Sequence, residues 1–266
     1  MEKVKPLKRF GQNYLRDNNI LDKIIKEISP SAEDFIIEIG PGTGALTSKL
    51  ASTGAEITAI EIDKRVKEDL SEKYPSVKFY NEDFLKTDLI NFYQRSGRKL
   101  RIAGNIPYNL TSPIIFKLIE ENNIINDAVL MVQYEVAKRM TSSRGSKDYG
   151  IFSVLLNYFS EVKFCFKVSP NVFYPKPKVF SAVIHIFMKE LTISNDLKKR
   201  FIEIVKASFG KRRKTLKNSL GDSIFKDIDF SESGIDLSLR AEQLNIKDFE
   251  KLALFTLNYP SYNAGR

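Results

Sequence analysis

The fold is decided at residues 35–47, which read FIIEIGPGTGALT. The first five residues have the apolar, β-branched character of a buried strand, and the residues after Gly44 fit the start of a helix. Gly40, Gly42 and Gly44 lie in the turn between them, where residues without a Cβ tolerate positive φ and let the backbone approach a ligand closely. Many strand-to-helix turns contain glycines only in order to turn, so this turn alone leaves a purely structural role open.

An acidic residue follows the glycine turn at the distance that is typical of nucleoside binding. The next predicted strand, residues 56–62, carries Glu61 near its end, where a carboxylate can accept hydrogen bonds from both ribose hydroxyls. A dinucleotide oxidoreductase would share this feature, but Glu38, Pro41 and an Asp83 that could accept a hydrogen bond from an adenine amine argue against it. The combination resembles the S-adenosylmethionine-dependent methyltransferases of the seven-strand class. This resemblance implies S-adenosyl-L-methionine as the cofactor.

Short runs rich in Ile and Val alternate along the chain with longer amphipathic segments, the pattern of a parallel sheet with crossover helices. The last two predicted strands are joined by the proline-bearing segment SPNVFYPKPKV, so we expect one strand to be antiparallel. The predicted fold class is α/β, a Rossmann-like seven-strand methyltransferase sheet with a smaller C-terminal helical domain. The predicted strands are 35–39, 56–62, 77–81, 100–104, 128–133, 162–168 and 180–187.

The chain changes in character after Lys189. Residues 197–220 place apolar side chains at helical spacing, and no further strand-like run follows. We therefore predict a catalytic domain over residues 1–189 that binds S-adenosylmethionine, and a helical RNA-binding domain over residues 190–266.

The net charge favours a polyanionic partner. The 266 residues include 42 Lys and Arg against 33 Asp and Glu, a formal charge of +9, which makes nucleic acid the leading partner and an anionic membrane the runner-up. One cysteine, Cys165, excludes an internal disulfide, and one histidine, His185, leaves no Cys/His cluster for zinc, so no metal site is predicted. The start of the chain lacks the apolar core of a signal peptide, and no apolar run reaches the roughly 20 residues that span a bilayer. We expect a cytoplasmic monomer that binds no membrane.

An ordered set of motifs resembles the KsgA family, the small-subunit ribosomal RNA adenine dimethyltransferases. The glycine turn alone is shared with many methyltransferases, and the Erm-type enzymes of the large-subunit RNA share the first and third motifs, so the specificity lies in the set. Ile106 and Leu110 stand where the family commonly has other apolar residues. The motifs are GQNYL at 11–15, EIGPGTGALT at 38–47, NIPYNLTSPI at 105–114, MVQYEVAKRM at 131–140, GSKDYG at 145–150, VFYPKPKVFSAV at 172–183 and RRKTLKNSL at 212–220.

The resemblance also implies a cofactor site. Gly40 would lie against the cofactor, Glu61 would hold the ribose and Asp83 the adenine, which agrees with the argument from the strand ends. Asn13 and Leu15 are included in this site only because of the resemblance, since a basic N-terminal arm is more often a solvated terminus. The implied cofactor-binding residues are Asn13, Leu15, Gly40, Glu61, Asp83 and Asn105.

The turn NIPY, which begins at Asn105, can serve N-methylation without an acid or a base. The exocyclic amine of adenine is a poor nucleophile because its lone pair is delocalised into the ring, so the site must localise that pair. The side-chain carbonyl of Asn105 and the backbone carbonyl of Ile106 or Pro107 could accept the two amine hydrogens, in a turn that proline stiffens. Tyr108 would stack on one face of the base and Phe173 on the other. Core packing before a proline bend is the alternative role of Phe173.

A basic run without acidic residues extends from Lys206 to Lys217. On a helix, its side chains could not all point away from a bound RNA. A solvated helix face is the alternative. The residues predicted to contact phosphates are Lys211, Arg212, Arg213 and Lys214.

Two classes of function are open from the sequence. The first, which we predict, is an enzyme that dimethylates the exocyclic amines of adjacent adenosines near the 3′ end of small-subunit ribosomal RNA, within a pre-ribosomal particle. Its nearest rival is Erm-type methylation of large-subunit ribosomal RNA. The second is a non-enzymatic nucleic-acid-binding protein on the same fold, which would need neither Glu61 nor the turn at Asn105. Glutamine or DNA-adenine methylation is a further alternative, but those enzymes typically have two prolines where this chain has Ile106 and Pro107.

Overall fold

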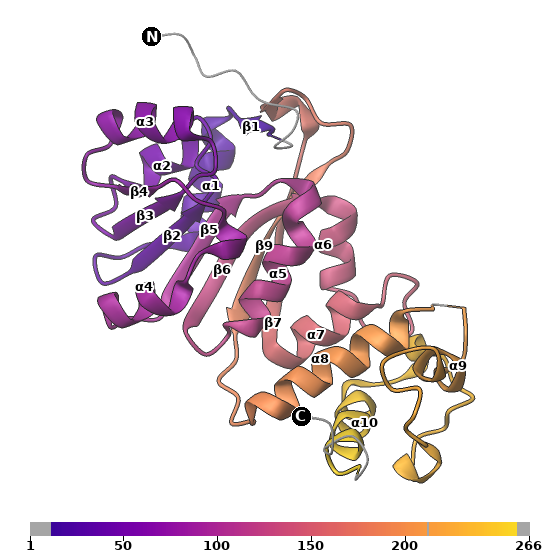
Figure 1. The fold of residues 1–266 in the computed structure, drawn as a ribbon. Helices are drawn as coiled ribbons and strands as arrows, with labels where there is room; N and C mark the ends of the chain where they lie inside the picture. The colour runs from indigo at the N-terminus through magenta and orange to yellow at the C-terminus, as the bar shows by residue number, and fades with distance from the viewer. Residues whose placement is uncertain (1–11, 212, 260–266) are drawn as a thin grey trace. The chain divides into compact units, whose positions relative to one another are not determined.

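The structure, a computed structural model, describes residues 12–211 and 213–259. The chain divides into two compact units, of which the first contains the main sheet and the second is mostly helical (Figure 1). The first unit comprises Met1–Ala137 with Glu161–Glu190, and the second comprises Lys138–Ser160 with Leu191–Arg266.

A seven-stranded sheet forms the centre of the first unit. Its strands are β2 (Phe35–Ile39), β3 (Glu56–Ile60), β4 (Lys78–Tyr80), β5 (Leu100–Asn105), β6 (Ile125–Gln133), β7 (Ser160–Val168) and β9 (Ser181–Met188). Their order is β4-β3-β2-β5-β6-β9-β7. The pairs formed by β2 to β6 are parallel, whereas β9 runs antiparallel to β6. The predicted α/β class and the predicted antiparallel strand are therefore confirmed.

Helices cover both faces of this sheet, as right-handed crossovers between parallel strands require. They are α1 (Asn18–Ile28), α2 (Ala45–Leu50), α3 (Lys64–Lys73), α4 (Leu89–Ser96) and α5 (Thr111–Glu120). Helix α6 (Tyr134–Met140) directly follows β6, and the division between the two units falls within it. Figure 1 shows α1, α2 and α3 on one side of the sheet and α4 and α5 on the other. The chain runs outward from β2 to β4 and then returns to β5 beside β2, so the strand order reverses between β2 and β5. Doubly wound sheets bind ligands at this kind of reversal.

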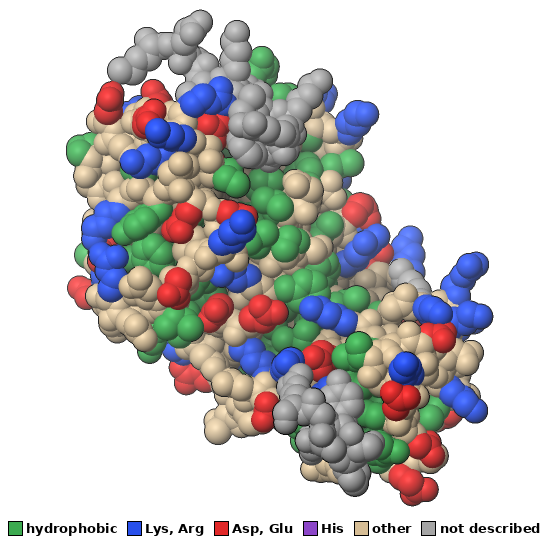
Figure 2. All heavy atoms as spheres, viewed as in Figure 1, with side chains coloured by type: hydrophobic (Ala, Val, Ile, Leu, Met, Phe, Trp, Pro, Cys, Tyr) green, Lys and Arg blue, Asp and Glu red, His purple; other side chains and the backbone are tan. Residues whose placement is uncertain are grey.

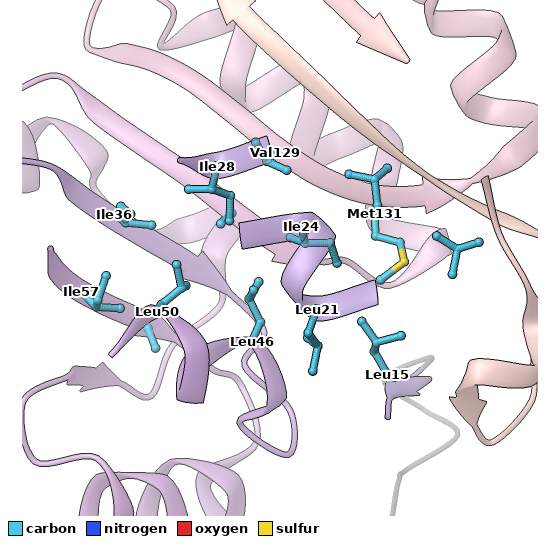
Figure 3. Close-up of a cluster of buried hydrophobic side chains, with 14 of the residues drawn as sticks. Leu15, Leu21, Ile24, Ile28, Ile36, Leu46, Leu50, Ile57, Val129 and Met131 are labelled. Atoms are coloured by element: carbon cyan, nitrogen blue, oxygen red, sulfur yellow. The ribbon is translucent and has the colours of Figure 1, made fainter. Parts of the chain in front are cut away.

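An apolar cluster fixes α1 and α2 against the sheet. Asp17 begins α1 by accepting a hydrogen bond from the N–H of Ile20 at 3.0 Å. Leu21, Ile24 and Ile28 recur on one face of the helix and are buried, and each contributes about 2 kcal/mol by this burial. Figure 3 shows the side chains of the cluster converging between these elements. Other members of the cluster are Leu15, Ile36, Leu46, Leu50, Ile57, Val129 and Met131.

A second, two-stranded sheet joins the N-terminal arm to the segment that precedes β9. Its strands, β1 (Tyr14–Leu15) and β8 (Phe173–Tyr174), pair antiparallel. The sequence did not predict them, because two residues are too few to show an alternating pattern. Beside this pair, the Arg16 guanidinium lies 4.0 Å from the centre of the Tyr174 ring.

A largely buried group of ionisable side chains spans β5, β6 and β9. Asp127 accepts hydrogen bonds from Arg101 at 2.8 and 2.7 Å, and its carboxylate lies 2.6 Å from Nε2 of His185. Burial acts to raise the pKa of Asp127, but the hydrogen bonds from Arg101 and His185 outweigh it and hold this pKa below its usual value. His185 is therefore a structural residue of the core.

Aromatic stacking holds the second unit together. Its described helices are α7 (Ile151–Phe159), α8 (Asn195–Phe209), α9 (Leu216–Gly221) and α10 (Ile246–Leu257). Tyr158 stacks on Phe201 with ring centroids 3.9 Å apart, which joins α7 to α8. Phe209 and Phe249 stack at 5.8 Å and join α8 to α10.

The two units differ in one respect from the predicted domains. The predicted boundary at 189/190 adjoins the division at Glu190, but the prediction also placed Lys138–Ser160 in the first domain. Because the aromatic residues of α7 pack on α8, that segment groups with the second unit instead. Over the described ranges of both units, no helix combines the length and the apolar character needed to cross a membrane.

Candidate functional site

A cavity of about 260 Å³ lies in the first unit, at the carboxyl ends of β2, β3 and β5. This is the place where the strand order reverses. Its walls come from the N-terminal arm, the glycine turn, the ends of β3 and β4, and the turn after β5. The lining includes residues 12–15, 39–43, 60–62, 82–85 and 105–110.

Two glycines of the turn have different roles. Gly40 has φ +62°, and a Cβ at this position would have no neighbour within 4 Å, so the backbone is open to a ligand. Gly42 has φ +56°, and a Cβ there would lie 2.9 Å from ring carbons of Tyr14. Gly40 therefore leaves room on the cavity wall, whereas Gly42 leaves room for the N-terminal arm.

Tyr14 connects the arm to the acidic side of the cavity. Its hydroxyl donates to Oε1 of Gln12 at 2.8 Å. Burial raises the pKa of Tyr14 to about 12, and the nearby carboxyls of Glu61 and Asp63 add to the rise. The phenol therefore stays protonated at neutral pH.

Glu61 follows β3 and is buried in the cavity wall. Its carboxylate accepts hydrogen bonds from the N–H of Asp63 at 2.9 Å and from the N–H of Gly42 at 3.3 Å. Burial raises the pKa of Glu61, and the two backbone hydrogen bonds oppose that rise. The carboxylate is thus held in a fixed position beside the glycine turn, where it can accept hydrogen bonds from ligand hydroxyls.

Glu38, the residue before Ile39 in β2, lies outside the cavity lining. It is 2% exposed, and the Thr47 hydroxyl donates to its carboxyl at 2.7 Å. Burial raises the pKa of Glu38 to about 8, the Thr47 hydrogen bond opposes the rise, and the Glu61 charge adds to it. Since Thr47 belongs to α2, this contact ties the strand before the glycine turn to the helix after it.

Asp83 lines the cavity, and Asn81 lies two residues before it, outside the lining. Asp83 is half-buried and accepts a hydrogen bond from the N–H of Leu85 at 3.0 Å, which caps the short helix η2 (Phe84–Lys86). Asn81 donates to the backbone carbonyl of Glu61 at 2.8 Å and so ties the chain after β4 to the chain after β3. Ile62 presents an exposed apolar side chain to the same cavity. A carboxylate beside an apolar surface can bind a planar ring that carries a hydrogen-bond donor at its edge.

Hydrogen bonds at Asn105, Pro107 and Tyr108 hold the turn after β5 in place. Nδ2 of Asn105 donates to the backbone carbonyl of Asn13 at 2.8 Å, which leaves Oδ1 as the acceptor of this side chain. The carbonyl of Pro107 accepts the N–H of Leu110 at 2.9 Å. The Tyr108 hydroxyl lies 2.7 Å from Oγ of the buried Ser181, and burial raises the pKa of Tyr108.

Most of the predicted cofactor and catalytic residues meet at this cavity. They reach it from five separate segments of the sequence, and their roles toward a cofactor and an RNA base stay predictions. The predicted residues that line the cavity are Asn13, Leu15, Gly40, Glu61, Asp83, Asn105, Pro107 and Tyr108.

Phe173 is the predicted residue that the structure does not bring to the cavity. It is 6% exposed, pairs with Leu15 and packs in the same apolar cluster as α1, whereas the adjacent Tyr174 is 50% exposed. Since successive side chains of a strand point to opposite faces, β8 directs Phe173 into the core. Phe173 therefore does not line the cavity in this structure, and its stacking on the target base stays a prediction.

Sequence reasoning missed several residues of the cavity wall. Tyr14 and Ile62 are examples, and each is adjacent to a residue that was predicted. The available signal was position: in a turn at a strand end, the neighbours of a ligand-facing residue often reach the ligand as well. Neither residue belongs to a pattern that would have singled it out.

The basic run is not one helix face. α8 ends at Phe209 and is followed by Gly210, and α9 begins only at Leu216, after Thr215 with its extended backbone. Between the two helices Arg213 and Lys214 are exposed, and Lys211 pairs with Asp222 at 2.6 Å. Arg212 lies outside the described residues. The argument that assumed one helix over the basic run therefore does not apply, and phosphate contact by these residues stays a prediction.

Figure 2 shows Lys and Arg side chains around α9 on one face of the second unit, with Asp and Glu side chains among them. In the part of the chain that the structure describes, no three His, Cys, Asp or Glu side chains are grouped so that they could hold a metal ion.

The fold and the cavity define a protein of the Rossmann-like methyltransferase class. Residues 4–256 match the family described as ribosomal RNA adenine dimethylase. The chain belongs to this family. The ribosomal RNA small subunit methyltransferase A of Francisella tularensis subsp. novicida (strain U112) is 44% identical over 261 residues, which are 95% of this chain and 98% of that protein. The family that the motifs indicated is thereby confirmed.

Solved structures give the same result. The crystal structure of a dimethyladenosine transferase from Plasmodium falciparum is 28% identical with a TM-score of 0.74, and covers 92% of this chain and 97% of that one. The 23S rRNA methyltransferase ErmE is 26% identical with a TM-score of 0.64, over 92% of this chain and 98% of that one. The likeness to the dimethyladenosine transferase is the stronger of the two.

Proposed function

We propose that this protein transfers methyl groups from S-adenosyl-L-methionine to the exocyclic amines of adjacent adenosines near the 3′ end of small-subunit ribosomal RNA. Membership of the adenine dimethylase family and the 44% identity to a protein named a small subunit methyltransferase support this reaction and this substrate. The observation that carries the proposal is that the turn at Asn105 lines the same cavity as Glu61 and the glycine turn. A protein that only bound RNA would need no such combination.

S-adenosyl-L-methionine fits the residues of the cavity. Gly40 leaves open space on the wall, Glu61 offers a fixed carboxylate for the ribose hydroxyls, and Asp83 offers a carboxylate for the adenine amine. Asn13 and Asn105 are joined by a hydrogen bond and would lie toward the methionine end. When bound, the cofactor supplies a methyl group on a positively charged sulfur, which makes that methyl group electrophilic.

The turn at Asn105 would activate the amine by accepting its hydrogens. Oδ1 of Asn105 is the acceptor atom of that side chain, because Nδ2 donates to Asn13. Of the two backbone carbonyls that could accept the second hydrogen, that of Pro107 already accepts the N–H of Leu110. The carbonyl of Ile106 is therefore the better candidate. Two acceptors in the plane of the amine direct its lone pair out of that plane, a contribution of position and electrostatics rather than of proton abstraction.

Tyr108 would hold the base beside these acceptors. Its hydroxyl is bonded to Ser181, which fixes the ring at the cavity wall and makes it a rigid stacking surface. Phe173 is left out of this proposal, since its ring packs in the core.

The substrate assay that tests the proposal compares two RNAs. Purified protein and methyl-labelled S-adenosyl-L-methionine are incubated with small subunits that lack the modification, and in parallel with naked large-subunit RNA. We expect label in the small-subunit RNA, recovered as dimethyladenosine near its 3′ end. Label in the large-subunit RNA alone would support the Erm-type alternative, and no label in either would support a binding protein.

A second test addresses the cofactor by itself. Glu61→Ala should weaken S-adenosyl-L-methionine binding at least about tenfold in calorimetry, because a charge-assisted hydrogen bond to the ribose is lost. Wild-type affinity in a folded Glu61→Ala protein would remove Glu61 from the cofactor site.

A further inference from the structure

Exposed aromatic rings and a lysine gather where β6 ends and β9 begins. Phe180 is 45% exposed and Phe164 is 38% exposed. Nζ of Lys167 lies 3.8 Å from the centre of the Phe180 ring and 4.5 Å from that of Tyr134. The rings of Tyr134 and Phe164 meet edge to face at 6.0 Å. We call Tyr134, Phe164, Lys167 and Phe180 the aromatic platform.

The platform lies beside the turn that we assign to the target adenosine. The N–H of Tyr134 donates to the carbonyl of Phe180 at 3.0 Å, which extends the β6–β9 ladder by one step beyond the pair of Gln133 and Ser181. Ser181 is the residue whose hydroxyl meets Tyr108. One strand, β6, separates β9 from β5, so the axes of these two strands lie about 10 Å apart, and the platform and the turn after β5 lie at the same edge of the sheet.

The charge around the platform favours an anionic ligand. Phe180 also lines a groove with Lys176 and Lys178. Lys167, Lys176 and Lys178 are exposed, and in the described part of the chain none of the three pairs with a carboxylate. Large aromatic rings are usually buried, and exposed rings beside lysines are the arrangement on which single-stranded nucleic acids stack.

We propose that the aromatic platform binds unpaired nucleotides that flank the target adenosine, with a base stacked on Phe180 and phosphates near Lys167 and the two groove lysines. This inference rests on the proposed function. An adenosine that enters the cavity leaves its stack, so its neighbours lose a stacking partner, and the exposed ring of Phe180 replaces it. Stacking requires only a π-face, so the platform holds the strand without selecting its sequence.

The test is the affinity of the full-length protein for a short single-stranded RNA that contains the target adenosines. Phe180→Ala and Phe180→Leu should both weaken binding about tenfold, because Leu restores apolar volume but no π-face, whereas Phe180→Tyr should keep affinity within about twofold. Val179→Ala, which removes the adjacent exposed apolar side chain, is the control and should bind as wild type does. S-adenosyl-L-methionine binding, measured in parallel, shows that each variant is folded.

An abasic scan locates the stacked nucleotide. Removal of the base at one flanking position should weaken wild-type binding as much as Phe180→Ala does, and should cost the Phe180→Ala protein nothing further, since base and ring form one pair. Wild-type affinity in both Phe180→Ala and Phe180→Leu, or an equal loss in Val179→Ala, would overturn the inference. Such a result would leave methylation by the wild-type protein intact, so it differs from a failure of the proposed function, in which the wild-type protein transfers no methyl group.

Discussion

At the scale of one residue, the buried Glu38 next to the glycine turn lowers the stability of the native protein as the pH rises. Burial raises its pKa from 4.5 in an exposed chain to about 8. Between these two pH values the native state holds a proton that the unfolded state releases, so stability falls as the pH rises from about 4.5 to about 8. The loss is on the order of a few kcal/mol, since each pKa unit corresponds to about 1.4 kcal/mol.

Glu38→Gln should remove this pH dependence, because an amide of the same shape stays neutral throughout. We expect the free energy of unfolding of the variant, relative to wild type, to rise between pH 5 and pH 8, as measured by denaturant titration at each pH. Glu72→Gln, which changes an exposed glutamate of α3, is the matched control and should leave the pH profile as it is. Parallel profiles for wild type and Glu38→Gln would mean that Glu38 is ionised in the native state.

Asn105 is the residue on which the proposed chemistry depends. Asn105→Ala should lower turnover about a hundredfold or more at saturating S-adenosyl-L-methionine, because the amine loses one of its two acceptors. RNA affinity should change little, since phosphate contacts dominate it. The measurement is single-turnover methyl transfer, with cofactor affinity determined alongside, because Asn105 also bonds to the arm at Asn13. Full dimethylation by the variant would mean that Asn105 takes no part in the chemistry and that the turn is only a strand end stiffened by proline.

Residues at strand ends could be predicted, because spacing along the chain places them at one edge of a parallel sheet. Glu61, Asp83 and Asn105 all line the cavity for this reason. Phe173 could not be placed, since the face to which a side chain points in a two-residue strand depends on its partner. That partner is Leu15, about 160 residues away in the sequence.

At the scale of elements, the N-terminal arm and the glycine turn fit each other. A Cβ on Gly42 would lie 2.9 Å from the Tyr14 ring, and the positive φ of Gly42 adds strain of about 1–2 kcal/mol for any L-residue. Gly42→Ala should therefore displace the arm and weaken cofactor binding.

A double-mutant cycle separates these two effects. The penalty of Gly42→Ala on S-adenosyl-L-methionine affinity should be smaller in a Tyr14→Ala background, because the clash is gone while the backbone strain persists. Gly40→Ala is the comparison, since its Cβ would meet no neighbour within 4 Å and Tyr14→Ala should not relieve it. Strictly additive penalties for Gly42→Ala and Tyr14→Ala would show that the arm does not rest on the turn in solution.

Elements with long periodic patterns were predictable, and short or interrupted ones were not. The strand at 35–39 agrees residue for residue with β2, because a short run of four apolar residues and Glu38 ends at a glycine turn. The basic run suggested one helix, yet the chain leaves α8 at Gly210 and begins α9 only after Thr215. Charged residues carry no periodic apolar signal, so the sequence offered little to mark that break.

At the scale of the whole molecule, we predict that the first unit binds the cofactor and that the second unit contributes contacts to RNA. The cavity residues belong to the first unit, whereas the basic turn between α8 and α9 belongs to the second. If Arg213 and Lys214 contact phosphates, their loss should weaken RNA binding and leave the cofactor site unchanged.

The last prediction replaces Arg212, Arg213 and Lys214 by Ala together. RNA affinity should fall, and its logarithm should decline less steeply with the logarithm of the salt concentration, because fewer counterions are released for each phosphate contact that is lost. A variant with Lys199, Lys226 and Lys247 changed to Gln is the control, since it removes the same charge from exposed positions elsewhere in the second unit. Calorimetry should give wild-type affinity for S-adenosyl-L-methionine in both variants. An equal drop in salt dependence in the two variants would assign the effect to net charge, whereas a drop confined to the first would assign the phosphate contacts to the turn between α8 and α9.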